Sequence, residues 1–237
     1  MEKREKLQIS RRLQAVAGLA STGMVLADVG CDHGYIPIYL LLKKRIPRAI
    51  AMDVNQGPLL RAEEHIRAWG LEKYIETRLS DGLCALAPGE AQCIVIAGMG
   101  GPLMEKILTE GEDRAKAARE LILQPQSEIG RFRRFLSENG YCILEETMIR
   151  EDGKYYPMMK AVCGKMKYER EAEYRYGKEL LVAKNPVLKE FLLREQAQAD
   201  QILSAIQDSS TDSARSRRKE LEEECRVRKE ALAYYEM

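Results

Sequence analysis

The sequence predicts an α/β protein with a Rossmann-like sheet of seven mostly parallel strands and a helical C-terminal extension. Short apolar segments rich in branched side chains alternate with amphipathic segments between residues 24 and 139, which is the pattern of a doubly wound sheet. Two more apolar segments, 141–149 and 155–162, follow each other without a helix between them. They predict a final two-stranded ribbon, so that one strand of the sheet runs antiparallel to the others.

The expected elements follow one another in a regular order. An amphipathic helix begins after a possible cap at Ser10 and ends near Gly23, because apolar residues recur there every three or four positions. Buried parallel strands are expected over 24–30, 48–54, 75–82, 91–98 and 120–125. Helices are expected through residues 38 to 44 and over 57–70, 102–110 and 127–139, with Gly70 as a stop signal and Pro102 in a first turn.

Beyond Gly164 the chain becomes charged and poor in glycine, with apolar residues at helical spacing from Leu188 to Leu232. The segment 209–213, SSTDS, contains the cap and turn residues expected between two antiparallel helices. We therefore expect a sheet domain with its N-terminal helix over 1–164 and a helical, coiled-coil-like domain over 165–237. The pattern leaves open whether the helical hairpin binds a partner or dimerises, so monomer and homodimer stay open.

The composition of the 237 residues excludes several classes of protein. No apolar run approaches the roughly 20 residues of a membrane span, and the charged start lacks the features of a secretory signal, so we expect a cytoplasmic protein. A net charge of +1 predicts that any contact with nucleic acid is local. Without a CxxC pair no metal site is expected, and four cysteines are expected to be reduced core residues: Cys84, Cys93, Cys142 and Cys163.

Glycines and carboxylates stand where three of the predicted parallel strands end. Gly30 and Gly34 follow the first strand, where they allow a tight turn and a close approach to a ligand. Asp53 ends the second strand, where a carboxylate can accept hydrogen bonds from both hydroxyls of a ribose. Asp81, before Gly82, ends the third and can accept from an adenine amino group. Each residue alone could be a turn or a helix cap, but together they predict an adenosine site.

The loop after the first strand indicates which adenosine cofactor binds. A dinucleotide fingerprint has a glycine in the middle of this loop, where the backbone approaches a pyrophosphate. Asp32 stands at the corresponding position. Because an anion repels pyrophosphate and attracts an ammonium or sulfonium group, S-adenosylmethionine is favoured over NAD.

The fourth strand ends in IAGMGG (96–101), which we expect to face the methyl group to be transferred. Enzymes that methylate an exocyclic amine tend to have Asn or Asp followed by Pro-Pro-aromatic here, and this chain does not. Its glycines leave space for a flat base, with backbone carbonyls as acceptors and Met99 as an adaptable apolar contact. The alternative is an ordinary glycine-rich turn between a strand and a helix.

These motifs carry a resemblance to a known family. The chain resembles the bacterial tRNA (adenine(22)-N1)-methyltransferases in SRRLQAVA, ADVGCDHGYIPIYL, AIAMDVNQGPL, RLSDGL, IVIAGMGG, LILQPQ and EDGKYY, in this order over about residues 7–162. The resemblance implies a class I methyltransferase fold, S-adenosylmethionine as cofactor, and N1 of an adenine in tRNA as the methyl acceptor. Cys31 and Gln126 depart from many members, which have Ser or Thr and Asn at these positions, and this puts the fine positioning of the substrate in doubt.

The resemblance also assigns site residues. It implies that the methyl donor is bound by Asp28, Gly30, Asp32, His33, Gly34, Asp53, Val54, Asp81, Gly82 and Gly98. It implies that the target base lies beside Tyr35, Gly98, Met99 and Gly100, with Asp32 as a carboxylate that could stabilise the developing positive charge.

Other residues carry weaker signals. Tyr155 and Tyr156 could stack on a base or simply form part of a half-buried strand pair, and Arg11 and Arg12 could contact RNA or lie on a solvated helix face. His33 could be a hydrogen-bonding loop residue or a proton carrier. For the whole chain, three alternatives remain: a methyltransferase of a small molecule or protein, a non-catalytic RNA-binding protein, and a dehydrogenase.

Overall fold

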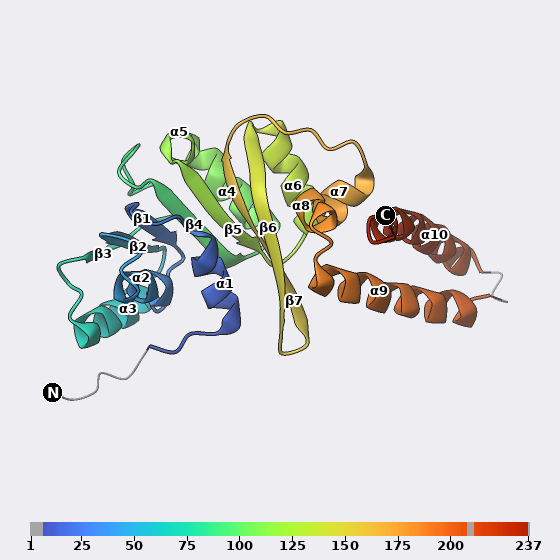
Figure 1. Cartoon of the computed structure of the whole chain (residues 1–237), viewed down its shortest axis with the longest axis horizontal. Helices are drawn as coiled ribbons and strands as arrows, with labels where there is room; N and C mark the ends of the chain where they lie inside the picture. The colour runs from blue at the N-terminus through green and yellow to red at the C-terminus, as the bar shows by residue number, and fades with distance from the viewer. Residues whose placement is uncertain (1–6, 208–210, 237) are drawn as a thin grey trace.

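The computed structural model describes residues 7–207 and 211–236, and its centre is one seven-stranded sheet (Figure 1). The strand order is β3-β2-β1-β4-β5-β7-β6. Only β7 runs antiparallel to its neighbours, β5 and β6, which confirms the predicted sheet. The strands are β1 Leu26–Val29, β2 Ala49–Asp53, β3 Ile75–Leu79, β4 Cys93–Met99, β5 Glu120–Pro125, β6 Tyr141–Glu151 and β7 Lys154–Cys163.

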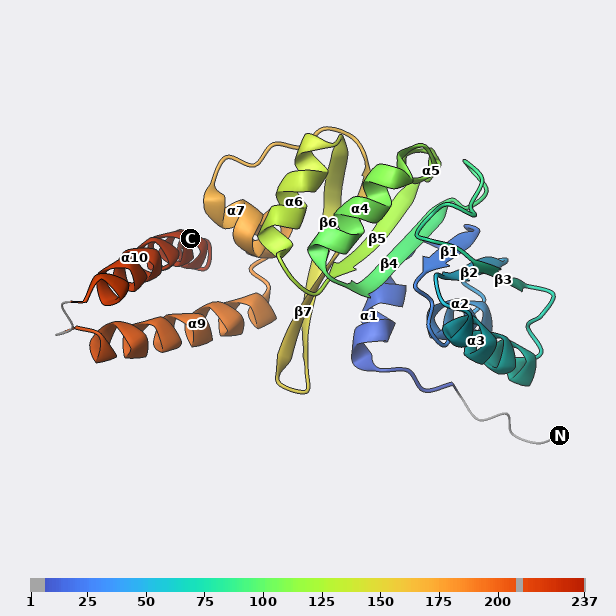
Figure 2. The same cartoon turned by 180° about the vertical axis from the view of Figure 1, so that it is seen from behind.

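Helices cover both faces of the sheet, as the two figures from opposite sides show (Figures 1 and 2). One face carries α1 Arg11–Leu19, α2 Tyr35–Leu42 and α3 Gln56–Trp69, and the other carries α4 Gly101–Glu110, α5 Glu112–Ala117 and α6 Ile129–Glu138. The central strands are buried on both faces. In β4, Cys93 and Val95 belong to the core under α1–α3, whereas Ile94 and Ile96 belong to the core under α4–α6, because successive side chains of a strand point to opposite faces.

The predicted helix signals act as expected. The Ser10 side chain caps α1 by accepting a hydrogen bond from the Leu13 amide at 3.2 Å. Gly70 ends α3 in the left-handed conformation with φ 67°. The short helix α5 was not predicted, because its six residues span fewer than two turns and show no apolar period.

Four helices follow the sheet: α7 Glu171–Tyr176, α8 Lys178–Val182, α9 Pro186–Ala205 and α10 Asp212–Ala233. The last two pack side by side as the predicted hairpin (Figure 1). Of the expected break, Ser209 and Ser210 lie outside the described residues, and Thr211 caps α10 by accepting a hydrogen bond from the Ala214 amide. The short helices α7 and α8 were not expected from the sequence.

A buried ion pair fixes α7 to the sheet domain. Arg133 of α6 is 1% exposed and donates to Glu146 of β6 at 2.7 Å. The same guanidinium donates to the carbonyls of Tyr174 and Arg175, which lie on α7, at 3.0 and 3.1 Å. A buried charge is costly without such partners. Through these bonds the arginine links α6, β6 and α7. Gly177, directly after α7, has φ 95°, and a Cβ there would lie 2.4 Å from the Glu146 carboxylate.

The hairpin between β6 and β7 links the first helix to the C-terminal helices. Glu151, at the end of β6, accepts hydrogen bonds from the amides of Arg11 and Arg12 at 2.7 and 3.3 Å. On the other side, Arg194 of α9 donates to the Gly153 carbonyl at 3.3 Å. In Figure 1 this hairpin projects between α1 and α9. It therefore couples the position of α1 to that of α9.

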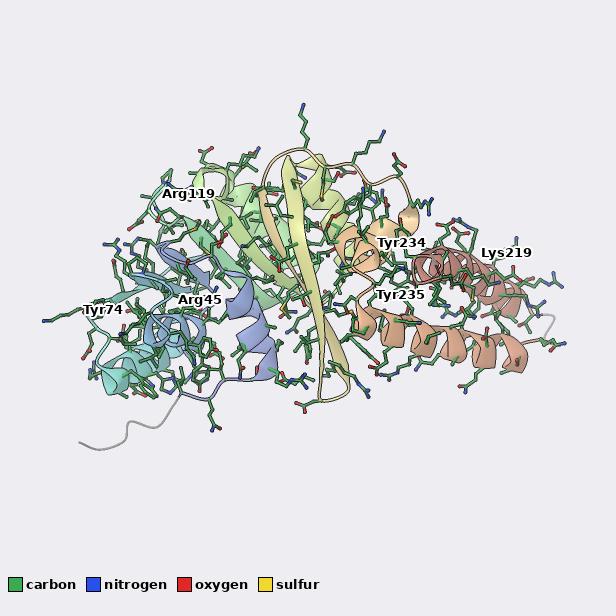
Figure 3. All side chains as sticks on the ribbon, viewed as in Figure 1. Arg45, Tyr74, Arg119, Lys219, Tyr234 and Tyr235 are labelled. Atoms are coloured by element: carbon green, nitrogen blue, oxygen red, sulfur yellow. The ribbon has the colours of Figure 1, made fainter. Side chains whose placement is uncertain are left out.

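Two tyrosines near the end of the chain fasten α10 to the elements beside it (Figure 3). The Tyr234 hydroxyl donates to Glu173 of α7 at 3.0 Å, and the Tyr235 hydroxyl donates to the carbonyl of Asn185, the cap of α9, at 2.9 Å. Hydrogen bonds therefore attach the C-terminal end of α10 to α7 and to the cap of α9.

The cysteines correct one expectation. All six carry free thiols, and Cys93 is buried and Cys142 half-buried, but Cys84 and Cys163 are exposed. The expectation of core positions was wrong for these two, because in the loop after β3 the inward positions belong to Leu83 and Leu86, and Cys163 is the outward last residue of β7. Over 7–207 and 211–236, no helix has the length and apolarity of a membrane span.

Candidate active site

The register of the sheet brings the ends of four parallel strands together. Val29 of β1 is paired with Met52 of β2 and with Ile96 of β4. Beyond this row, the amides of Gly30 and Cys31 both donate to the Met52 carbonyl, at 2.8 and 2.9 Å. The Ser80 amide donates to the Asp53 carbonyl at 2.9 Å. The segments that follow β1, β2, β3 and β4 therefore lie next to one another at the carboxyl edge of the sheet, where open α/β sheets bind ligands.

A cleft of about 240 Å³ opens at this edge beside β1 and β4. Six residues expected at the site line it: Asp28, Gly30, Asp32, His33, Tyr35 and Gly98. Five more line it without having been assigned to the site from the sequence: Leu13, Cys31, Ile36, Ala97 and Gln126. Arg12, for which the sequence left open an RNA contact or a solvated helix face, also lines it. Over the described ranges 7–207 and 211–236, no group of three or more acidic, histidine or cysteine side chains is arranged to hold a metal ion.

The loop between β1 and α2 turns sharply. Gly30, Asp32 and Gly34 all have positive φ, of 72°, 43° and 68°, a region that glycine enters at little energetic cost. Position 30 also has no room for a side chain, because a Cβ there would lie 2.2 Å from the terminal methyl of Met99. Gly34 begins α2, close against Ala62 of α3.

Asp28, at the end region of β1, is the carboxylate inside the cleft. Its residue is 3% exposed. Burial, and after it the neighbouring charge of Asp53, raises the pKa of the Asp28 carboxyl to about 7. Within residues 7–207 and 211–236 no side chain or amide donates to this group, so a buried carboxyl faces the cleft without a cationic partner.

Asp32 is oriented differently from the sequence expectation that it attracts the cofactor cation. It lines the cleft, but its side chain is 61% exposed and its Oδ1 accepts from Arg61 of α3 at 3.0 Å. Its other oxygen lies 3.6 Å from His33 Nε2. The attraction expected of Asp32 is therefore already partly met by Arg61, and Asp28 is the better placed anion.

The ends of β2 and β3 extend the site beyond the cleft. Asp53 is 8% exposed, and its Oδ1 accepts from the Asn55 amide at 2.9 Å at the start of α3. This bond forms a turn before the helix and does not cap it, because the N-cap of α3 is Asn55, and within the described chain the second oxygen has no hydrogen-bond partner. Val54 and Asp81 are exposed, and Gly82 turns with φ 55° against Ile107 of α4. These four residues lie at the open edge next to the cleft.

The other half of the cleft is lined by α1, β4 and the segment after β5. Gly98 has φ 84°, and a Cβ there would lie 3.6 Å from Arg12 Nη1 and 3.7 Å from Gln126 Nε2. Arg12 donates to the buried Gln124 side chain at 3.0 Å and lies 5.7 Å from the Tyr156 ring. A guanidinium, amide side chains and a glycine backbone therefore border this half.

Met99 and Gly100 support the cleft without lining it. Met99 is half-buried, packs against the core under α4–α6 and reaches Gly30 with its methyl group. Gly100 caps α4, and a Cβ there would lie 2.9 Å from the Ser127 hydroxyl. Both residues therefore lie behind the loops that form the cleft.

Two histidine rings stack on Tyr35, which lines the cleft. His33, Tyr35 and His65 stack on one another with centroid distances of 5.2 to 5.3 Å. His65 Nδ1 lies 3.1 Å from the His33 carbonyl, which ties α3 to the loop. His33 Nδ1 is buried and has no hydrogen-bond partner among the described residues.

The comparisons with known proteins agree with this geometry. A family model described as a methyltransferase domain matches residues 9–159. The tRNA (adenine(22)-N(1))-methyltransferase of Bacillus subtilis is 34% identical, over 96% of this chain and 98% of that protein.

Solved structures extend the similarity to the whole fold. The crystal structure of the Bacillus subtilis m1A22 tRNA methyltransferase matches with a TM-score of 0.83 and 34% identity, over 95% of this chain and 99% of that one. A proposed tRNA (m1A22) methyltransferase of Streptococcus pneumoniae, solved in complex with S-adenosyl-L-methionine, matches with a TM-score of 0.83 and 34% identity, over 95% of this chain and 100% of that one. Both similarities include the helices that follow the sheet.

Proposed function

The chain belongs to the bacterial tRNA (adenine(22)-N1)-methyltransferase family, and we propose that it transfers a methyl group from S-adenosylmethionine to N1 of an adenine in tRNA, at position 22. The observation that carries this proposal is the match along 96% of the chain, which continues through the C-terminal helices beyond the methyltransferase domain at 9–159.

The residues of the cleft fit S-adenosylmethionine, which supplies an activated methyl group when bound. The unpartnered, buried Asp28 carboxylate suits the ammonium group of this cofactor. The free oxygen of Asp53 suits a ribose hydroxyl, and Asp81 lies at the next strand end for the adenine amino group. Gly30 lets the backbone approach the ligand. The remaining donor contacts that we propose are Asp32, His33, Gly34, Val54, Gly82 and Gly98.

The half of the cleft around Gly98 is the proposed place of the target adenine. N1 of adenine has a free lone pair, so the protein need not remove a proton before the methyl carbon is attacked. The enzyme then contributes mainly proximity and orientation. We propose that Tyr35 and Gly98 contact the base, with Met99 and Gly100 shaping the loop behind it, and that Arg12 and Gln126 also border the base.

The methylated base carries a positive charge. A nearby anion stabilises this charge as it develops, and the carboxylates at the cleft are Asp28 and Asp32. We propose Asp32, the exposed one of the two, as the carboxylate on the side of the base. The ammonium group of the donor would pair with Asp28.

The two parts of the chain divide the work. We propose residues 1–164 as the methyltransferase domain, of which 1–6 lie outside the described residues, and 165–237 as a helical domain that contacts the body of the tRNA. We propose a cytoplasmic location, where the tRNA substrate is.

The experiment is methyl transfer from labelled S-adenosylmethionine to unmodified tRNA, followed by digestion and mass analysis of the nucleosides. The expected product is N1-methyladenosine at one position, lost when that adenine is replaced by guanine. Label confined to protein or small molecules, or to another nucleoside, would refute the substrate. NAD serves as a competitor, and it should not reduce the transfer.

A further inference from the structure

We propose that a second pocket, between the β6–β7 hairpin and the C-terminal helices, binds another nucleobase of the RNA strand whose adenine enters the active-site cleft. This inference rests on the proposed function for the identity of the RNA. The pocket encloses about 430 Å³ and is larger than the cleft. Its walls come from the start of α6, from β6 and β7, and from α7 and α9.

The walls of the pocket carry aromatic rings. Tyr155 of β7 and Phe191 of α9 are both half-buried and pack edge to face, with centroids 5.1 Å apart and an angle of 60° between their planes. Tyr176 of α7 and Leu188 of α9 add buried surface. Single-stranded RNA is read by proteins that stack its splayed bases on such rings.

Strand alternation sends two neighbouring tyrosines to two different sites. Tyr156 lies on the α1 side of the sheet, with its ring 5.7 Å from the Arg12 guanidinium at the cleft. Tyr155 points to the opposite face and lines the second pocket. The β6–β7 hairpin therefore has a ring on each side, one toward each pocket.

Arginines surround the stacking surface. The guanidinium groups of Arg150 and Arg194 lie 5.7 and 5.8 Å from the centre of the Tyr155 ring. Both residues are exposed, and Arg175 also lines the pocket. Cations at the rim suit the phosphates on either side of a bound base. Acidic partners accompany these arginines, because Arg150 pairs with Glu190 at 2.5 Å and Arg175 with Glu224 at 3.6 Å. The aromatic surface, more than the local net charge, therefore favours a nucleobase as the ligand.

Two carboxylates give the pocket hydrogen-bond acceptors. Glu128 and Glu195 both line it, and they also accept hydrogen bonds from Arg131 and Tyr176. A carboxylate only accepts hydrogen bonds, so a base in the pocket meets these groups with its N–H donors. All four bases have such donors: adenine, guanine and cytosine through an amino group, and uracil through N3–H.

Hydrogen bonds and close packing hold the back wall of the pocket in place. Arg133, which lines the pocket, is held by Glu146 and by two carbonyls of α7. The close approach of α6 to α7 needs Gly130, because a Cβ there would lie 3.2 Å from the Arg175 Cα. A preformed wall loses little entropy on binding, which favours affinity.

The linings of the two pockets adjoin in the chain. Gln126 lines the cleft and Glu128 lines the second pocket, and two residues of extended chain span at most about 7 Å. A strand that passes over residues 126–128 can therefore contact the linings of both pockets. This continuity is why we choose RNA over a peptide as the occupant.

The test measures tRNA affinity and methyl transfer for Tyr155→Leu, with Tyr155→Phe and Tyr74→Leu as matched variants. Tyr74 is 51% exposed and lies at the far end of the molecule (Figure 3). Loss of one stacked base is expected to raise the tRNA Kd and KM about tenfold in Tyr155→Leu, with S-adenosylmethionine affinity unchanged. Tyr155→Phe keeps the ring and should bind tRNA like wild type, as should Tyr74→Leu.

Equal tRNA affinity of Tyr155→Leu and Tyr74→Leu would overturn the inference. If Tyr155→Leu fails to fold, ultraviolet cross-linking of wild-type protein to tRNA decides, with each adduct assigned to a single residue by peptide fragmentation: adducts on Tyr155 or Phe191 support the pocket, and adducts only on Tyr156 or elsewhere overturn it. If wild-type protein binds tRNA but methylates no adenine, only the proposed function is refuted. The pocket is still tested in that case, because the tRNA affinities of the variants can be compared without methyl transfer.

Discussion

Replacing Asp28 by asparagine tests the electrostatics of the cleft through two quantities, because it should lower the affinity for the donor and raise the stability of the ligand-free protein. The carboxyl is buried, and burial raises its pKa from 3.8 to about 7. Because the ionised form attracts the donor ammonium, wild-type affinity for S-adenosylmethionine should rise as pH increases toward neutrality. With a pKa of about 7, the carboxylate fraction is about 9% at pH 6 and about 50% at pH 7. The Kd is therefore expected to fall about fivefold across this unit.

The stability of the ligand-free protein should change with the opposite sign. The folded pKa of Asp28 lies above the unfolded value, so the unfolded chain releases this proton first. The free energy of unfolding then falls as pH rises from about 3.8 to about 7 and stays lower above that. An asparagine side chain cannot ionise, so Asp28→Asn should be more stable than wild type at pH 8, by at most on the order of 4 kcal/mol.

Calorimetric titration of the donor between pH 5.5 and 7.5 and thermal unfolding of the ligand-free protein measure both effects. Asp28→Asn should bind the donor weakly, with little dependence on pH, and should unfold at a higher temperature at pH 8. His33 lines the same cleft, so a pH response that persists in Asp28→Asn would belong to another group. A wild-type Kd equal at pH 6 and pH 7, or a variant that is less stable at pH 8, would refute the reasoning.

Three further substitutions probe the rest of the account. Asp53→Ala should weaken donor binding by about 1 to 3 kcal/mol, the loss of a hydrogen bond to a charged acceptor, and calorimetry showing unchanged affinity would rule out the ribose role. Met99→Ala should slow single-turnover methyl transfer while donor affinity stays nearly intact; a variant that mainly unfolds would instead place Met99 in the core. Gly177→Ala should destabilise the chain by at least about 2 kcal/mol through strain at positive φ and the clash with Glu146, lowering Tm by about 4 to 8 °C. Gly140→Ala, with φ 78° and open space around it, is its control, and equal Tm losses would show that the clash contributes nothing.

The sheet could be predicted because its signals are local. Each central strand is a short apolar segment buried on both faces, and each is followed by a turn residue or a helix start that one can read directly. The unpredicted helices α5, α7 and α8 have six, six and five residues, too few turns to show an apolar period. Their positions depend on tertiary contacts such as those of Arg133.

The candidate site could be predicted where it depends on strand ends and not where it depends on packing. Gly30, Asp53 and Asp81 follow adjacent strands, so topology alone brings them together. Arg12 and Gln126 reach the cleft from α1 and from the segment after β5, and no spacing in the sequence announces this. The direction of a side chain is also hidden, since Asp28 faces the cleft while Asp32 turns to Arg61.

The same distinction explains the two tyrosines of the β6–β7 hairpin. Their aromatic character suggested stacking, and strand alternation puts them on opposite faces. Only the position of α9 shows that Tyr155 has a pocket beside it, formed with Phe191. Sequence alone could not place α9, because its contact with the hairpin joins residues about 40 positions apart.

A crystal structure determined with S-adenosylmethionine tests the central claim most directly. The account predicts the ribose against Asp53, the ammonium against Asp28, and the methyl group directed toward the space beside Gly98. Clear density for the cofactor at another surface, or an empty cleft at saturating concentration, would contradict it.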